Sequence, residues 1–150
     1  MNESVAIILA RGGSKRIPNK NIKFFEGQPI INYSIRAAIQ SRCFDRVIVS
    51  TDDHQIANIS EKAGAEIPFY RSKKNSNDEA TTSNALVEVI NRLDKIYDSF
   101  CCIYPTSPLI NYENLIYAKK TLLKNNMIDG IIPVCEFSHS PQRSLIKSGD

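Results

Sequence analysis

Short apolar runs alternate with longer amphipathic stretches along this chain. Runs rich in Val, Ile and aromatic residues, each followed by polar or turn-forming residues, predict strands at 5–9, 46–50, 66–70, 100–104 and 130–134. Pro68 has no backbone N–H to donate to a ladder, so the 66–70 strand is expected at a sheet edge. Between these runs, apolar residues recur three or four positions apart and predict helices around 31–39, 56–63, 86–93 and 115–122.

This alternation of strands and helices predicts an α/β fold, a doubly wound and mostly parallel sheet with helices on both faces. In such a sheet, ligands bind beyond the carboxyl ends of the strands. The chain places its notable polar clusters in the loops that follow four of the predicted strands, at 10–23, 51–53, 71–82 and 105–108. Function is therefore expected at this edge of the sheet.

The first of these loops has the composition of an anion-binding site. From Arg11 to Lys23 it carries five basic residues and no acidic one, and Gly12 and Gly13 leave the backbone N–H groups accessible. Neither the Walker phosphate loop nor the dinucleotide GxGxxG pattern is present, so a different phosphate cradle is required. Arg11, Lys15 and Lys20 can each neutralise a phosphate charge, although a merely solvated basic loop is the alternative interpretation.

Composition bounds the class of protein. A length of 150 residues fits one domain, 1–150, and a net charge of +3 is too small to indicate a nucleic-acid partner. The apolar run at 5–10 is too short for a signal peptide or a membrane span, which favours a cytoplasmic protein without membrane association. The four cysteines lack metal or redox spacing and are predicted to be reduced core residues. A turn signal at 148–150 without a return strand indicates the front part of a longer, C-terminally truncated pattern.

Two further groups are candidate metal ligands by residue type alone. Asp52 and Asp53 precede a predicted helix, where aspartate commonly caps the first turn, and capping is the favoured interpretation. His54 and His139 have no Cys or second His at metal-binding spacing and are expected to be surface or loop residues. The metal ligands therefore remain unknown from the sequence.

At this level of detail the chain resembles the cytidylyltransferases that activate nine-carbon sugar acids, the sialic acid type. The resemblance rests on four segments in order, at 10–22, at 44–52, at 71–82 and at 105–109. Tyr104 and the segments 101–104 and 141–143 resemble the pseudaminic acid branch, whereas 105–108 is closer to the sialic and legionaminic pattern. The resemblance implies a Rossmann-like nucleotidyltransferase that transfers CMP from CTP to the anomeric hydroxyl of a nonulosonic acid, pseudaminic acid favoured, and releases pyrophosphate.

The resemblance also implies residue roles. Arg11, Lys15 and Lys20 are the candidate catalytic residues. CTP would be bound by these three residues and by the following others: Ala10, Gly12, Gly13, Ser14, Asn21, Arg71, Ala80 and Thr82. Arg71 would reach the pyrimidine edge, unless it is a surface arginine, and Thr81 and Thr82 are equally suited to capping a helix. The candidate sugar-binding residues are Tyr104, Thr106, Ser107, Gln142 and Arg143, although Thr106 and Ser107 also suit a tight turn.

Cofactor and partners follow from the same resemblance. Mg²⁺ is implied, with the phosphates supplying oxygen ligands, and the family's metal-binding carboxylates would lie beyond this sequence. A homodimer is implied for the full-length form. Two alternatives stay open: a fragment that binds CTP without turning it over, and a cytidylyltransferase for sialic, legionaminic or octulosonic acid.

Overall fold

The computed structural model describes residues 3–125 and 127–136. Its helices and strands follow in the order β1 (Ser4–Leu9), η1 (Lys20–Ile22), β2 (Phe24–Phe25), β3 (Gln28–Pro29), α1 (Ile31–Ser41), β4 (Arg46–Ser50), α2 (His54–Lys62), η2 (Lys73–Asn75), α3 (Thr82–Arg92), β5 (Ser99–Ile103) and α4 (Tyr112–Lys124). The four predicted helices and the strands predicted near 5–9, 46–50 and 100–104 are thereby confirmed.

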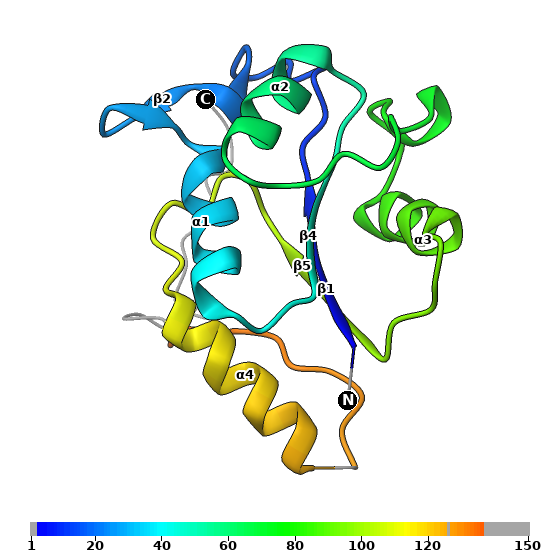
Figure 1. Cartoon of the computed structure of the whole chain (residues 1–150). Helices are drawn as coiled ribbons and strands as arrows, with labels where there is room; N and C mark the ends of the chain where they lie inside the picture. The colour runs from blue at the N-terminus through cyan, green and yellow to red at the C-terminus, as the bar shows by residue number, and fades with distance from the viewer. Residues whose placement is uncertain (1–2, 126, 137–150) are drawn as a thin grey trace, which may run out of the picture.

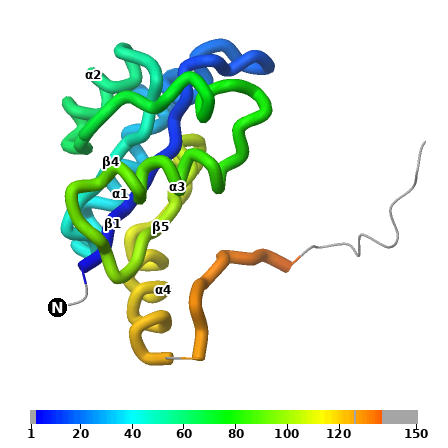
Figure 2. The backbone as a smooth tube through the Cα atoms, turned by 90° about the vertical axis from the view of Figure 1, so that its right-hand side faces the viewer, coloured from blue at the N-terminus to red at the C-terminus, as the bar shows by residue number. Residues whose placement is uncertain are grey.

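The central sheet has the strand order β4-β1-β5, and both pairings are parallel. β1 lies in the middle because its run of Val, Ala and Ile is apolar on both faces, which suits a strand covered on both sides. Figure 1 shows α1 and α4 on one side of the sheet and α3 on the other; Figure 2 shows α3 from its own side, in front of the strands. The predicted doubly wound α/β class is confirmed.

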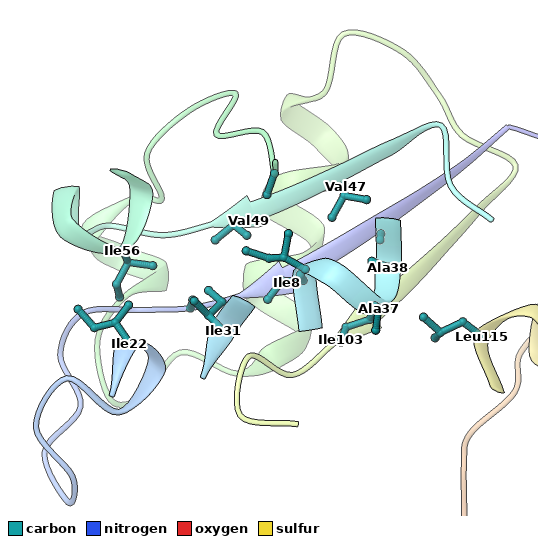
Figure 3. Close-up of a cluster of buried hydrophobic side chains, with 14 residues drawn as sticks. Ile8, Ile22, Ile31, Ala37, Ala38, Val47, Val49, Ile56, Ile103 and Leu115 are labelled. Atoms are coloured by element: carbon teal, nitrogen blue, oxygen red, sulfur yellow. The ribbon is translucent and has the colours of Figure 1, made fainter. Parts of the chain in front are cut away.

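Alternate residues of β1 serve the two faces. Ala6 and Ile8 belong to a cluster built with residues of α1, α2 and α4, whereas Val5 and Ile7 pack with Val89 of α3. Figure 3 shows the larger cluster, to which β1 contributes Ile8 and α1 contributes Ile31. Because both faces are packed, the strand ends and the loops that follow them are held in place.

Two predicted strands are wrong. The segment 66–70 forms only a single parallel bridge, between Glu66 and Ile48 of β4, and Pro68 without its N–H explains why no ladder continues. The segment 130–134 is irregular, and its apolar side chains at 131, 132 and 134 are exposed. Cys135 is exposed as well, so it is not the core residue that the sequence predicts.

A short hairpin that the sequence pattern did not reveal follows η1. β2 and β3 pair antiparallel across Glu26 and Gly27, which both have positive φ, 43° and 82°. Two central residues with positive φ are the mark of a tight turn whose twist matches that of the strands. In the part of the chain that the structure describes, no helix is long and apolar enough to cross a membrane.

Candidate functional site

The loop after β1 is joined to the end of β4 and to the residues after it by two hydrogen bonds, and a third hydrogen bond lies within the loop. The buried Ala10 donates its N–H to the carbonyl of Ser50 at 2.9 Å, which continues the pairing with β4. Gly12 donates its N–H to Oδ1 of Asp52, and Nδ2 of the buried Asn21 donates to the carbonyl of Arg11, both at 2.9 Å. The predicted nucleotide contact Asn21 is therefore an internal support of the loop in this structure.

The two glycines have different surroundings. A Cβ on Gly12 would lie 2.8 Å from both Cβ and Oδ2 of Asp53, so this position has no room for a side chain. Gly13 has no neighbour within 4 Å of such a Cβ and borders open space. Ser14 folds back, donating its N–H to the carbonyl of Gly12 at 2.8 Å. Gly12 thus allows the loop to pack closely against Asp53, whereas the backbone at Gly13 borders open space.

Asp78 joins this loop to the loop that precedes α3. Nη2 of Arg11 lies 2.9 Å from Oδ1 of Asp78, and Lys15 forms an ion pair with the other carboxylate oxygen. Arg11 also donates from Nη1 to the carbonyl of Asn77 at 2.6 Å. Hydrogen bonds from Lys15 and then from Arg11 hold the pKa of Asp78 below its usual range. Two of the predicted phosphate-binding cations are therefore gathered around one carboxylate.

Lys20 lies in η1 of the same loop and is exposed. Figure 1 shows this loop and the loop before α3 at the same end of the sheet. Because β4, β1 and β5 of the central sheet are parallel, this end is its carboxyl edge, where ligands are expected.

Arg71 is buried, with only 7% of its surface exposed. Its Nε donates to Oγ of Ser50 at 2.9 Å, Nη2 donates to the carbonyl of Ser50, and its N–H donates to the carbonyl of Thr51 at 2.8 Å. Burial lowers the pKa of Arg71, and the carboxylates of Asp52 and Glu88 oppose that effect. The guanidinium is thus fixed at the end of β4, next to the loop after β1.

The other predicted base-pocket residues follow on the same loop. Ala80 donates its N–H to Oδ1 of Asn77 at 2.8 Å, and Thr82 is the exposed first residue of α3. Thr81 is the N-cap of that helix, its Oγ1 accepting from the N–H of Asn84. The capping interpretation is confirmed for Thr81, and Thr82 is not the N-cap.

The predicted sugar-binding residues that the structure describes follow β5. Tyr104 is exposed, and its carbonyl accepts a hydrogen bond from Oγ of the buried Ser34 at 2.9 Å. Thr106 and Ser107 are half-buried in the turn that leads to α4, and the carbonyl of Ser107 accepts from the N–H of Ile110. Gln142 and Arg143 lie outside the described residues.

The acidic pair at 52–53 divides into two roles. Asp53 caps α2, with Oδ1 accepting from the N–H groups of Gln55 and Ile56 at 2.8 and 2.9 Å, which confirms the capping prediction. Asp52 instead supports Gly12. His54 is exposed, and its Nδ1 lies within hydrogen-bond distance, 2.8 Å, of the hydroxyl oxygen of Tyr70. Across residues 3–125 and 127–136 no three His, Cys, Asp or Glu side chains cluster closely enough to hold a metal ion.

Three residues of this edge were not predicted as site residues from the sequence. Asp52 and Asp78 support or neutralise the loop after β1, and Glu88 reaches the loop before α3 from within the helix. Asp52 and Asp78 sit in loops at the carboxyl edge, so their position was a usable signal. Glu88 lies inside a helix, and its helical pattern alone does not distinguish it from an exposed glutamate.

Comparison with known proteins agrees with this arrangement. Residues 5–142 match the family model described as Cytidylyltransferase. The chain is 40% identical over 146 residues to a pseudaminic acid cytidylyltransferase of Campylobacter jejuni, a match that covers 95% of this chain and 62% of that protein. It is 37% identical to N-acylneuraminate cytidylyltransferase A of Danio rerio, over 97% of this chain and 33% of that protein. The chain thus spans less than two thirds of the length of these relatives.

Solved structures support the same fold. A structure of CMP:2-keto-3-deoxy-manno-octonic acid synthetase complexed with CTP superposes with a TM-score of 0.72 at 24% identity, covering 84% of this chain and 49% of the other. At that identity the similarity establishes the fold alone. The family match spans nearly the whole chain, from β1 past the loop after β5, and with it the chain belongs to the cytidylyltransferase family.

Proposed function

We propose that the protein transfers CMP from CTP to the anomeric hydroxyl of a nonulosonic acid, with pseudaminic acid as the favoured acceptor. The observation that carries this proposal is the meeting of the cationic loop after β1 with the loop before α3, through Arg11, Lys15 and Asp78. A triphosphate needs clustered cations, and a base needs a fixed donor beside them. Arg71, held by Ser50, supplies that donor.

In the proposed reaction the anomeric oxygen attacks the α-phosphorus of CTP. The bond from that phosphorus to the bridging oxygen of the leaving group breaks, pyrophosphate departs, and the hydroxyl proton passes to water. Negative charge builds on the phosphoryl and leaving oxygens, so positioning and charge stabilisation carry the catalysis. Arg11, Lys15 and Lys20 would provide that stabilisation. Arg11 and Lys15 would exchange the carboxylate of Asp78 for phosphate oxygens when CTP binds.

The base and the sugar would occupy neighbouring loops. Arg71, the backbone at Ala80 and the hydroxyl of Thr82 would bind the cytosine base. Tyr104, Thr106 and Ser107 follow β5, which pairs directly with β1, so their hydroxyls would face the sugar acid across the loop after β1. Gln142 and Arg143 remain the proposed partners of its carboxylate. Magnesium would arrive with the triphosphate, whose oxygens are ligands that it prefers.

The identity of the acceptor rests on relatives. The 40% identity to the pseudaminic acid cytidylyltransferase of Campylobacter jejuni supports pseudaminic acid, as does Tyr104 in the pattern of that branch. A CMP-N,N′-diacetyllegionaminic acid synthase of Legionella pneumophila is 36% identical over 76% of this chain, so legionaminic acid belongs in the same test.

The test is pyrophosphate release. The protein is incubated with CTP, Mg²⁺ and pseudaminic, legionaminic, sialic or octulosonic acid in turn, with UTP replacing CTP as the control. We expect pyrophosphate and the CMP-sugar, identified by mass spectrometry, with pseudaminic acid and little with UTP. Release with another acid alone would correct the acceptor. Release with none, while calorimetry detects CTP binding, would leave a CTP-binding module and refute the transferase proposal.

A further inference from the structure

Glu88 has a largely buried, charged side chain whose hydrogen-bond partners lie on the loop before α3 and on α3 itself. It lies in α3, and only 8% of its side chain is exposed. Oε1 accepts from the N–H of Ser72 at 2.8 Å and from Nη1 of Arg92 at 2.9 Å, and Oε2 accepts from Oγ of Ser72 at 2.8 Å and from Nδ2 of Asn75. The carboxylate is therefore satisfied by four donors.

Burial disfavours the charged form of Glu88, yet the hydrogen bonds from Asn75 and Ser72 outweigh burial and lower its pKa to about 2. The side chain is thus an anion at neutral pH. Hydrogen bonds to an ionised acceptor are roughly twice as strong as those between neutral groups. The ionised carboxylate therefore holds its hydrogen-bond donors more firmly than a neutral side chain at the same position would.

Those residues are the immediate neighbours of Arg71. Ser72 follows Arg71 directly and is bound twice, while Arg92, oriented by Glu88, donates to the carbonyl of Tyr70 at 3.1 Å on the other side. The guanidinium carbon of Arg92 also lies 3.8 Å from the ring centroid of Phe69. The backbone is therefore held immediately before and immediately after Arg71 by one pair of side chains on α3.

Hydrogen bonds also connect Glu88, through the loop before α3, to the proposed phosphate-binding residue Arg11. Asn75 donates a hydrogen bond to Glu88, and Oγ of Ser76 donates to the carbonyl of Ser72 at 2.9 Å. The carbonyl of the following residue, Asn77, accepts a hydrogen bond from Arg11. Glu88 is also a favourable charge for the buried guanidinium of Arg71. In the structure, the loop before α3 is thus anchored on the helix at one end and on Arg11 at the other.

We propose that Glu88, together with Arg92, is the positioning residue that sets Arg71 and the loop before α3 in the conformation that receives the cytosine base of CTP. Glu88 acts through Ser72, Asn75 and Arg92 without contacting the nucleotide. The inference rests on the proposed function, in which Arg71 faces the base. The competing explanation is that Glu88 only stabilises the fold.

The test compares Glu88→Gln with the native protein in calorimetric titrations of CTP and of inorganic tripolyphosphate. The glutamine keeps the size of the side chain but replaces the anion and one acceptor oxygen. We expect the Kd for CTP to rise on the order of tenfold. The Kd for tripolyphosphate, which engages the loop after β1, should change by less than about twofold, because the expected loss lies in base positioning. Glu61→Gln, on the exposed surface of α2, is the matched control and should change neither Kd.

Ser72→Ala is the milder second variant, because it removes one donor to Glu88 and leaves the charge in place. It should raise the Kd for CTP in the same direction by a smaller factor, and it decides the question if Glu88→Gln does not fold. Unchanged CTP binding in folded variants would overturn the inference while the proposed function stands. An equal loss of CTP and tripolyphosphate binding would assign Glu88 a general structural role instead. If the native protein binds no CTP, the proposed function and the inference both fail.

Discussion

Replacing Gly12 by alanine tests how the loop after β1 is seated. The new Cβ would lie 2.8 Å from Cβ and Oδ2 of Asp53 and 3.2 Å from its Cγ. Two carbon atoms pack best at about 3.5–4.0 Å, so the overlap with the Asp53 Cβ is on the order of 1 Å. Asp53 is not free to move aside, because its Oδ1 accepts from the N–H groups of Gln55 and Ile56 at the start of α2.

The overlap can be relieved in two ways, and both cost stability. If Asp53 moves, α2 loses its N-cap, which contributes about 1 kcal/mol. If the loop moves, Gly12 loses its hydrogen bond to the carboxylate of Asp52, and a bond to a charged group contributes about 1.5–3 kcal/mol. We therefore expect Gly12→Ala to lower the free energy of unfolding by about 1–3 kcal/mol, in line with other overpacked sites. For a domain of this size that corresponds to a fall in Tm of roughly 3–10 °C.

Gly13→Ala is the matched control, because a Cβ at Gly13 meets nothing within 4 Å. Both substitutions restrict the unfolded chain alike, so the difference in Tm between the two variants isolates the steric cost at Gly12. Thermal unfolding followed by circular dichroism measures that difference, and CTP titration of the same samples should show weakened binding in Gly13→Ala despite its native Tm. Equal Tm values for the two variants, within about 1 °C, would refute the proposed contact between Gly12 and Asp53.

Three further predictions concern charge. Lys20→Ala should lower the turnover of CTP on the order of tenfold without changing Tm, because Lys20 is exposed. The control Lys62→Ala, at the end of α2, should change neither quantity. Equal turnover rates in the two variants would show that Lys20 does not belong to the site. Asp78→Asn should tighten pyrophosphate binding in calorimetry, because the competing carboxylate beside Arg11 and Lys15 loses its charge, whereas weaker binding would make Asp78 a support of the site. The pKa of Glu88 is lowered from 4.5 to about 2, so its contribution to stability is present above pH 4.5 and is lost as the pH falls through about 2. Urea unfolding should show the stability gap between native protein and Glu88→Gln closing across that range, and a gap independent of pH would contradict the lowered pKa.

The layers of the fold could be predicted from the sequence because strands and helices depend on the spacing of apolar residues within short segments. β1 and β4 are buried on both faces, and the helices carry apolar residues at helical spacing, so pattern alone identified them. The segment 66–70 failed because strand-like composition cannot overcome a proline in the ladder. The hairpin of β2 and β3 was not predicted because its turn requires a positive φ at Glu26, which glutamate seldom adopts.

Within the site, residue types were predictable but partners were not. The cations at 11, 15 and 20 stand out in one short loop, whereas the carboxylate that meets two of them is more than 60 residues away in sequence. Arg71 was predicted as a base contact from its place at a strand end, but the sequence did not show that Ser50 would accept its hydrogen bonds and fix its guanidinium. Such pairings depend on which loops the sheet brings together, and a single sequence does not contain that distance information.

The central position of β1 also has a consequence for how the protein folds. β1 gains its two neighbours from far along the chain, since Ile7 pairs with Ile48 on one side and with Cys102 on the other. Parallel pairings of this kind require long loops to close first, and they form slowly compared with helices. The partners of the loop after β1 also come from later in the chain, Asp52 directly after β4 and Asp78 in the loop before α3. If the proposed CTP site is correct, CTP would bind only after these parts of the fold have met, and it would then stabilise the native topology against partly folded states.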